Sequence, residues 1–468
     1  MNPNNHSVQT TCNTRSGVAI ERGVLFVLAL LVAGPAAHAA DSDLDPTFSG
    51  DGIAYADWAA PLRTDSPVRV AVAADVKVYV GGTVVRGGSN RDFAIARMRA
   101  DGTFDSGFGF QGFRTVGFDL VADGFDTLNG VYPLADGKLM LLGRAEIPTD
   151  IVARARPAMV RLTSAGDADP TFGDAGKRVF TQSPWPSASL YVGNSTRQAD
   201  GKFLFGGYCL NCPDTYRAVV LRVSANGEPD PTFGTNGWAS IPVEGQPRFN
   251  AIATDPEGRI VLAGYRVAIT PNRPVLVRFT PSGQADASFG AGTGEVQVSS
   301  LPATAPAGWE ASALAIERDG SLLVAVREVT PPATSKTGIM RLAADGTFDA
   351  AYAGTGFRDL TRENGSRING LALRSDRRLF AVGQIDHTGG GPDVYVARLL
   401  ANGNLDNSFD GNGVLRIELE PGSSSDAAVD VILSGGKPLI GGYANRAGNV
   451  DGAVLRLQSD LIFADGLD

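Results

Sequence analysis

The chain has 468 residues, 58 of which are Gly, and its formal net charge at pH 7 is −9. An acidic chain is a poor candidate for binding nucleic acid, because phosphates require a dense basic surface. The length by itself predicts about three domains, but the internal repeats of the chain indicate one continuous body.

The first 39 residues are typical of a secretory signal peptide. Arg15 and Arg22 precede an apolar run at residues 24–34, and small residues precede a cleavage point after Ala39. The apolar run is too short to span a bilayer as a mature anchor. We therefore expect residues 1–39 to be removed and the protein to be exported to the periplasm, the cell surface or the medium. An uncleaved membrane anchor is the alternative.

A short signature recurs about every sixty residues along the rest of the chain. It consists of an Asp, two variable residues, an aromatic residue and, four or five residues later, a Gly. A fixed period of this size is typical of repeat architectures. The seven copies begin at Asp45, Asp105, Asp169, Asp230, Asp286, Asp349 and Asp406.

Each repeat also contains four short runs with the two-residue period or the continuous apolar character of β-strands. Tight turns separate two of these runs, as in DGKLMLLG from Asp136 and GGKPLIGG from Gly435. We therefore expect an all-β, seven-bladed β-propeller of four-stranded blades over residues 40–460, with a short tail at residues 461–468. A linear β-solenoid is the alternative, although its ends need caps.

An Arg lies eight residues before six of the seven signature Asp residues. Arg456, the last such Arg, has no Asp eight residues after it, and Asp45 has no Arg eight residues before it. In a closed ring each would complete the other. We therefore predict that residues 44–52 lie beside the last blade and close the ring. The set comprises Arg97, Arg161, Arg222, Arg278, Arg341, Arg398 and Arg456.

The signature and the Arg-Leu segment before it resemble the delta-60 repeat family of bacterial β-propeller proteins. The resemblance is seen in RLAADGTFDAAYAGTG from Arg341 and in RLLANGNLDNSFDGNG from Arg398, and it covers essentially all of the mature chain. Two copies depart from the pattern, because Tyr352 replaces Phe and the copy at Asp286 has one extra residue. The resemblance implies a propeller fold and an exported bacterial protein, and it implies no particular activity.

We interpret the repeated signature as a structural element at the junctions between blades. Its Asp accepts backbone N–H bonds in a turn, its aromatic residue fills the space between blades, and its Gly adopts a backbone shape closed to other residues. The repeated Arg fixes the loop through a charge-assisted bond. A calcium loop is the alternative, but the residue before the final Gly varies from Asp51 to Ala175, and calcium needs several fixed oxygens. We expect no metal site.

Cys209 and Cys212 form the motif CLNC in a predicted loop between two strands. In an exported protein we expect a local disulfide at this spacing. A redox role would require the helix N-terminus that lowers the pKa of a reactive thiol. A zinc site would require two more soft ligands, and the sequence offers none nearby.

The scarcity of histidine and the placement of tryptophan argue against several enzyme classes. His387 is the one His after Ala39 and lies in a Gly-rich loop, so a catalytic triad or a metal site would have to use it alone. No dinucleotide-binding or phosphate-loop motif is present, and we expect no cofactor. Trp58, Trp185, Trp238 and Trp309 share no common place in the repeat, unlike the regularly placed Trp of quinone-cofactor propellers.

We place the signatures on one face of the ring and the irregular loops on the other. Variable loops on a rigid scaffold usually carry function. We expect a monomeric, non-catalytic, exported scaffold that binds a protein, a glycan or a cell-envelope surface. The alternative is a polysaccharide hydrolase or lyase with paired carboxylates. The candidate binding residues are Arg86, Arg91, Arg154, Arg156, Arg217, Arg266, Arg273, Arg327, His387 and Arg446, and Arg144 belongs to the same basic set.

Overall fold

The structure is a computed structural model, and contacts divide the chain into two units, residues 1–38 and residues 39–468. The predicted signal peptide, the tail at residues 461–468 and His387 lie outside the described residues. The described residues are 42–58, 65–88, 90–148, 154–185, 189–212, 215–267, 272–299, 301, 308–329, 336–362, 365–386, 390–420, 425–446 and 449–458.

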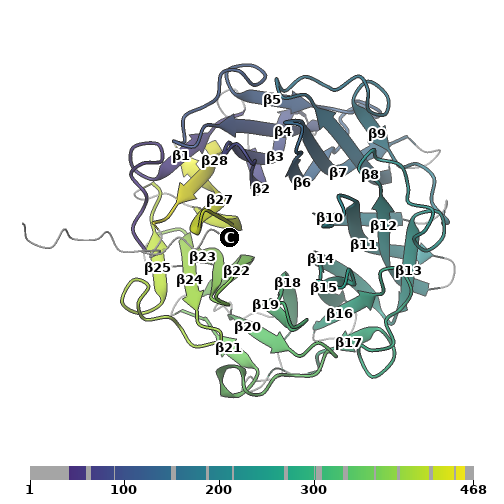
Figure 1. Ribbon diagram of the computed structural model, residues 1–468, viewed down its shortest axis with the longest axis vertical. Helices are drawn as coiled ribbons and strands as arrows, with labels where there is room; N and C mark the ends of the chain where they lie inside the picture. Colours follow the sequence, from purple (N-terminus) through teal and green to yellow (C-terminus); the bar gives the residue numbers. More distant parts are fainter. Residues whose placement is uncertain are drawn as a thin grey trace, which may run out of the picture. The chain divides into compact units, whose positions relative to one another are not determined.

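The described residues of the second unit form seven four-stranded antiparallel sheets, which surround a central axis as blades (Figure 1). The predicted all-β, seven-bladed propeller is therefore confirmed. In each of the first six blades the chain runs from the innermost strand to the outermost one. The single helical segment among the described residues is the 3-10 turn Tyr352–Gly354.

Twenty-eight strands, four to a blade, make up the seven blades of the described part of the chain. The first three are β2 (Asp65–Val72), β3 (Val78–Gly87), β4 (Asn90–Met98) and β5 (Phe113–Val116); β6 (Thr127–Pro133), β7 (Leu139–Ile147), β8 (Arg154–Leu162) and β9 (Lys177–Val179); and β10 (Ser189–Arg197), β11 (Phe203–Cys212), β12 (Thr215–Val223) and β13 (Trp238–Val243). The next three are β14 (Gln246–Thr254), β15 (Ile260–Val267), β16 (Arg273–Phe279) and β17 (Glu295–Gln297); β18 (Trp309–Ile316), β19 (Leu322–Glu328), β20 (Thr337–Leu342) and β21 (Phe357–Asp359); and β22 (Ser366–Leu373), β23 (Leu379–Ile385), β24 (Asp393–Leu399) and β25 (Val414–Ile417). The last is β26 (Ala427–Ser434), β27 (Lys437–Arg446), β28 (Asn449–Arg456) and β1 (Ile53–Ala56).

The connections between strands divide between two faces of the ring. The first and third connections of each blade lie on one face, which we call the signature face, because the third connection holds the signature. The second connections and the links between blades lie on the opposite face, which we call the loop face. The prediction that the signature connects one blade to the next along the chain is wrong. The strand after each signature pairs with the strand before it in the same blade, as β5 pairs with β4.

The ring is closed by the N-terminal segment, as predicted. β1 pairs with β28, and Ile53 lies opposite Leu455 in that pair. Just before β1, the amide of Asp45 donates to the carbonyl oxygen of Arg456 at 2.8 Å. The last blade therefore contains strands from both ends of the propeller, which leaves no open edge at the junction.

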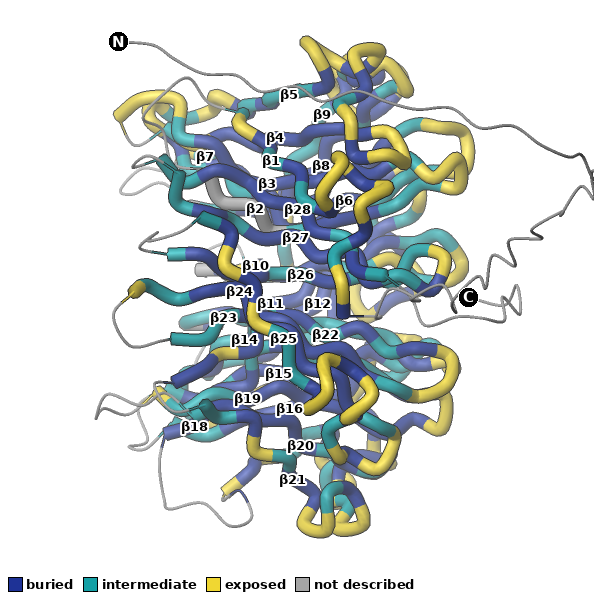
Figure 2. Tube along the Cα trace, turned by 90° about the vertical axis from the view of Figure 1, so that its left-hand side faces the viewer, coloured by how far each residue is buried: buried dark blue, intermediate teal, exposed yellow. Residues whose placement is uncertain are grey.

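The hydrophobic core lies within and between neighbouring blades. Phe93 on β4, Leu128 on β6 and Val160 on β8 belong to one buried cluster that spans two successive blades. Figure 2 shows buried segments through the middle of the ring and exposed segments at many of the turns. Such packing holds the seven blades in one rigid frame. Among the described residues, no helix is both long and apolar enough to cross a membrane.

Candidate functional site

The signature Asp and the repeated Arg form an ion pair in every blade. In five blades the Arg Nε atom lies 2.6 to 3.0 Å from the Asp Oδ2 atom, and Arg97 reaches Asp105 through Nη2 at 3.0 Å. Arg341 pairs with Asp349 in the remaining blade. The five Nε pairs are Arg161–Asp169, Arg222–Asp230, Arg278–Asp286, Arg398–Asp406 and Arg456–Asp45.

The same arginines also join one blade to the next. Nη1 of Arg222 donates to the carbonyl oxygen of Pro281 in the following blade at 2.6 Å. Nη1 of Arg456 donates to the carbonyl oxygen of Ala100 in the first blade at the same distance. The signature loops add backbone bonds across these junctions, such as the one from the Gly234 amide to the Ser282 carbonyl at 2.9 Å. The signatures are therefore structural joints between blades.

Both carboxylate oxygens of the first signature Asp are engaged by protein donors. Oδ1 of Asp45 accepts from the amide and the hydroxyl of Thr47, and Oδ2 accepts from Lys437 and Arg456. Burial by itself would raise the pKa of Asp45, but these donors outweigh it and lower the pKa to about 2. The described residues contain no group of three or more His, Cys, Asp and Glu placed to hold a metal ion.

The signature aromatic residue packs under the guanidinium of its Arg. In six blades the guanidinium carbon lies 4.4 to 5.0 Å from the centre of a Phe ring, which is the geometry of a cation–π contact. The exception is the blade with Tyr352, where Arg341 also pairs with Glu317 at 2.6 Å. The six rings are Phe48, Phe108, Phe172, Phe233, Phe289 and Phe409.

Several of the predicted loop arginines are paired with acidic or polar groups of the protein itself. Arg266 is 3% exposed and contacts both Glu244 and Glu295. Arg446 bonds Glu420 at 2.5 Å and stacks over the ring of Tyr55 at 4.1 Å. These pairs neutralise the positive charge that the sequence showed in the loops.

The remaining predicted arginines are spread around the loop face and do not gather at one place. Arg86 lies 3.4 Å from Asp92, and Arg91 stacks over Phe125 at 4.9 Å. The others lie on four blades: Arg154 opens β8, Arg156 is buried on the same strand, Arg217 donates to Ser240 at 2.9 Å, Arg273 opens β16 and Arg327 lies on β19.

Cys209 and Cys212 form a disulfide at the loop-face end of the β11–β12 hairpin. Both sulfur-bearing side chains are fully buried in a core cluster. The bridge therefore closes the hairpin directly beside Tyr208, which precedes Cys209 on β11.

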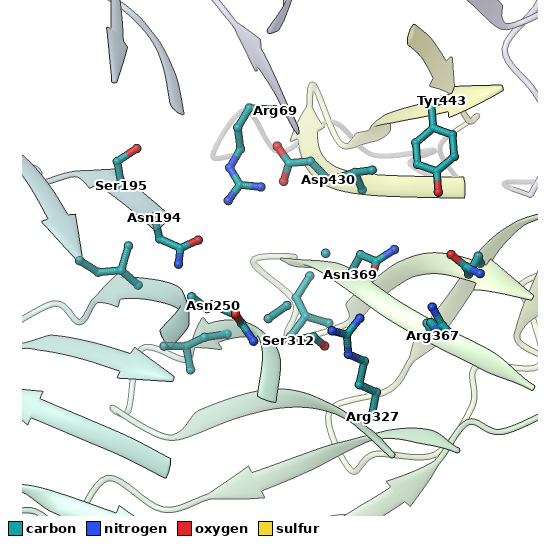
Figure 3. Close-up of a pocket in the computed structure, with 18 residues that line it drawn as sticks. Arg69, Asn194, Ser195, Asn250, Ser312, Arg327, Arg367, Asn369, Asp430 and Tyr443 are labelled. Atoms are coloured by element: carbon teal, nitrogen blue, oxygen red, sulfur yellow. The ribbon is translucent and has the colours of Figure 1, made fainter. Parts of the chain in front are cut away.

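A cavity of about 470 Å³ lies among the innermost strands of the ring (Figure 3). Its wall is predominantly polar. The side chains of Arg69 on β2 and Arg327 on β19 extend into it. Of the predicted binding residues, Arg327 is the one that lines this cavity. The lining also includes Asn194, Ser195, Asn250, Ser312, Arg367, Asn369, Gln384, Asp430 and Tyr443.

A β-bulge interrupts the innermost strand of every blade at the level of this cavity. A bulge re-aims a side chain away from the regular pleat. At five junctions a polar side chain at or beside the bulge donates to a carbonyl oxygen of the next blade at 2.7 to 3.4 Å. These donors, which we call the inner belt, are Asn129, Asn194, Asn250, Ser312 and Asn369, and the acceptors are Val192, Phe249, Ala311, Ile368 and Ala428.

Two further contacts complete the circuit of the inner belt. Oδ2 of Asp430 accepts from the amide of Val70 at 3.1 Å, and the amide of Leu128 donates to the Thr83 hydroxyl at 3.2 Å. Burial raises the pKa of Asp430, and the positive charge of Arg69 opposes that shift. Every junction between blades is therefore bridged around the cavity.

Several large polar side chains, mostly arginine and tyrosine, lie on the loop-face side of the bulges, and Arg327, Arg367, Gln384 and Tyr443 among them line the cavity. They occupy the innermost-strand positions just before the bulges and the cross-strand partners of those positions on the second strands. Arg–carboxylate and Tyr contacts are frequent components of binding sites. We call the ten larger side chains at these positions the mouth ring: Arg144, Tyr191, Tyr208, Arg248, Tyr265, Glu310, Arg327, Arg367, Gln384 and Tyr443.

Members of the mouth ring contact one another within blades and across one blade junction. The rings of Tyr191 and Tyr208 stack with centroids 4.9 Å apart, and the guanidinium of Arg248 lies 4.6 Å above Tyr208. Nη2 of Arg327 donates to Glu310 at 3.2 Å. Burial raises the pKa of Tyr208 to about 12, although Arg248 opposes the shift, so the phenol stays protonated at neutral pH.

The mouth ring carries a surplus of positive charge in an acidic protein. It contains four Arg and one Glu, whereas the whole chain has a formal net charge of −9. Arg367 is exposed, and its side chain makes no hydrogen bond or ion pair to another described residue. The cavity mouth is therefore an electropositive site of a kind that recognises anionic groups.

Comparison with known proteins is consistent with a β-propeller built from repeats. Residues 74–108, 198–233, 256–289 and 374–409 match a family model described as Domain of unknown function (DUF5122) beta-propeller. These segments cover less than a third of the chain. The sequence matches none of the curated proteins compared with it.

Several solved structures are similar to this one at low sequence identity. A Dyadobacter fermentans protein of unknown function is 12% identical with a TM-score of 0.44, and the match covers 71% of this chain and 95% of that one. The polysaccharide lyase Uly1 is 15% identical with a TM-score of 0.48, and the match covers 86% and 91%. Trypanosoma rangeli sialidase is 8% identical with a TM-score of 0.38, and the match covers 84% of this chain and 55% of the sialidase.

Proposed function

We propose that this protein is an exported, non-catalytic β-propeller that binds an anionic ligand at the loop-face end of its central cavity. The ligand belongs to a glycan, a protein or another component of the cell envelope. The observation that carries this proposal is the convergence of Arg69, Arg327 and Arg367 on one polar cavity. Arg is the side chain best suited to bind carboxylate and other planar anions, because its donors form a fixed fork.

The proposal includes export by the N-terminal segment and membership of the delta-60 repeat family. The segment before Ala39 has the basic flank, apolar run and small residues of a signal peptide. Mass spectrometry of the protein recovered from a bacterial host tests this directly. A mature chain that begins at Ala40 supports export, and a full-length chain retained in the cell contradicts it.

The alternative of a hydrolase or lyase with paired carboxylates has less support. Such a mechanism needs two carboxyl groups that flank the bond to be cleaved. Asp430 is the one carboxylate among the described residues that line the cavity, and it is engaged by the Val70 amide. We therefore favour binding without catalysis.

A binding screen of the purified protein tests the proposed function. Glycans, envelope fractions and acidic proteins are immobilised, and captured ligands are incubated with the protein and inspected for products. We expect binding that weakens steeply with salt, because exposed charges are screened within about 10 Å at 0.1 M salt. Salt-independent binding, or release of shortened products, would contradict the proposal.

A further inference from the structure

We propose that the ligand of this site is an acidic oligosaccharide that lays a sugar ring on Tyr191 and turns its anionic groups toward the arginines of the mouth ring. This inference rests on the proposed function and adds the chemical class of the ligand. The anionic group is a carboxylate or a sulfate ester, and the two are separated by experiment.

The size of the cavity favours a short flexible ligand. Its volume of about 470 Å³ falls within the range of roughly 300 to 1,000 Å³ typical of small-molecule sites. A folded protein domain cannot enter a space of that size between the innermost strands. A few units of a chain-like ligand can enter it from the loop face.

A flat aromatic surface lies on β10, on the loop-face side of the bulge that precedes the cavity residues Asn194 and Ser195. Tyr191 is 38% exposed, and it stacks on Tyr208 with an angle of 10° between the rings. The guanidinium of Arg248 lies over both rings, 4.6 Å from Tyr208 and 6.0 Å from Tyr191. A tyrosine offers an apolar face and a polar edge, which matches the apolar face and the hydroxyl groups of a sugar ring.

The positive charge needed for an acidic ligand lies beside this surface. Arg144 and Arg248 are on the blades that flank Tyr208, and Arg327 and Arg367 line the cavity itself. Arg367 has no internal carboxylate partner among the described residues. By contrast, loop arginines such as Arg266 are already neutralised. The mouth ring therefore holds four arginines beside the aromatic surface, against the single carboxylate of Glu310.

Neutral polar groups further along the wall suit sugar hydroxyls. Gln384 and Tyr443 present an amide and a phenol at the same level as Arg367. Amides and hydroxyls can donate and accept, as sugar hydroxyls do. An acidic peptide would need apolar pockets for its other side chains, and the cavity wall is predominantly polar. The chemistry of the wall thus favours a sugar over a peptide.

Isothermal titration calorimetry with defined probes tests this assignment. The probes are a short oligogalacturonate, the same oligosaccharide with methyl-esterified carboxyl groups, a sulfated oligosaccharide, a neutral cello-oligosaccharide and a short glutamate peptide. We expect the oligogalacturonate or the sulfated oligosaccharide to bind, and the neutral and esterified sugars to bind at least tenfold more weakly. The stronger of the two acidic probes identifies the anionic group.

Three variants place the binding at the mouth ring. Arg367→Gln is expected to weaken binding roughly 10- to 100-fold, because it removes a charge-assisted contact. Tyr191→Ala is expected to weaken it about threefold to tenfold through loss of the ring face. The matched control is Arg114→Gln on the outermost strand β5, where the side chain is 38% exposed and should leave affinity unchanged. Circular dichroism checks that each variant folds.

The possible results distinguish failure of the sugar assignment from failure of the proposed anion-binding site. Equal binding of the glutamate peptide, or binding insensitive to Tyr191→Ala, overturns the sugar assignment and leaves an anion site at the mouth. Binding that Arg367→Gln does not change overturns both. Failure of every acidic probe to bind also overturns both, whereas tight binding of the neutral sugar overturns the acidic class alone.

Discussion

The Oδ2 atom of Asp45 lies 2.8 Å from Nε of Arg456, although 411 residues separate the two in the sequence. Asp45 is fully buried, and its carboxylate also bonds Lys437 at 2.6 Å. The pair joins the segment before the first blade to the last strand of the last blade. The same Arg–Asp ion pair occurs in every other blade, but only here do its two residues come from opposite ends of the propeller.

Loss of this carboxylate should destabilise the ring at its closure. Asp45→Asn leaves Lys437 and Arg456 without their buried partner, so the free energy of unfolding should fall by roughly 3 kcal/mol. Urea denaturation measures the change. Hydrogen exchange should also become faster in β1 and β28, and not in the other blades.

Two control variants distinguish a loss of ring closure from a general loss of stability. Asp51→Asn alters an exposed residue of the same loop and keeps the oxygen that accepts from the Ile53 amide, so stability should stay within about 0.5 kcal/mol. Asp230→Asn breaks the equivalent pair inside one blade and should not speed exchange in β28. Equal rates of hydrogen exchange in β28 for Asp45→Asn and Asp230→Asn would contradict the role of Asp45 in closing the ring.

The signature carboxylates should make the protein sensitive to acid. Asp45 and Asp230 have a folded-state pKa of about 2, below the ordinary value of about 3.9, because their hydrogen-bond donors and positive neighbours outweigh the opposing effect of burial. Their contribution is therefore complete above the unfolded pKa and is lost as the pH falls through about 4 toward 2. Each should contribute on the order of 2 kcal/mol.

Urea midpoints measured between about pH 6 and about pH 2 test this dependence. Wild-type stability should decline toward acid, and Asp230→Asn should show a smaller decline because one of the titrating groups is absent. A variant and a wild type with parallel pH profiles would show that Asp230 does not titrate in this way. The comparison is informative because Asn cannot bind the proton.

The sequence predicted the ring and its closure because both follow from spacing. The repeated distance from Arg to Asp left Arg456 and Asp45 without partners, and a ring supplies them. The loop arginines were harder to interpret, since their partners lie on other strands. Arg266, for example, is buried against Glu295, which lies on the outermost strand of the same blade. The sequence alone does not show that the charge of Arg266 is neutralised by a carboxylate on another strand.

The sequence did not reveal the mouth ring, because each blade contributes two residues or fewer to it. Its members stand just before the bulges, and a bulge has no reliable signal in one sequence. A partial signal does exist on the second strands. There the mouth residue follows the Gly that ends the apolar run, as in Gly207-Tyr208, Gly264-Tyr265 and Gly442-Tyr443.

That Gly is required by the close approach of the innermost strand. A Cβ atom added to Gly207 would lie 1.9 Å from the carbonyl oxygen of Tyr191. Gly207→Ala should therefore separate β10 from β11, reduce the free energy of unfolding by roughly 3 kcal/mol and disturb the stacked tyrosines. Thermal or urea unfolding and the near-ultraviolet circular dichroism of tyrosine measure both effects.

Gly193 provides a control on the same pair of strands. The nearest atom to a Cβ added there is 3.8 Å away, which is an ordinary van der Waals distance. Gly193→Ala should leave stability and the tyrosine signal nearly unchanged. If the two variants lose stability equally, the close contact at Gly207 is not the cause.

The disulfide should stabilise the hairpin beside Tyr208 to a modest extent. A bridge between Cys209 and Cys212 closes a short loop, for which chain entropy gives about 2 kcal/mol. Replacing both Cys with Ser should lower the midpoint of thermal unfolding, and adding reductant to the wild type should lower it in the same direction. A reductant effect of equal size on the double variant would point to a different origin.

A crystal structure of the protein with a short oligogalacturonate or its sulfated counterpart would show directly where an acidic oligosaccharide binds. We expect a sugar ring to lie against Tyr191 and an anionic group to lie within hydrogen-bonding distance of Arg327 or Arg367 in the central cavity. An acidic oligosaccharide bound at the signature joints or along the outer strands, with the cavity mouth vacant, would contradict it.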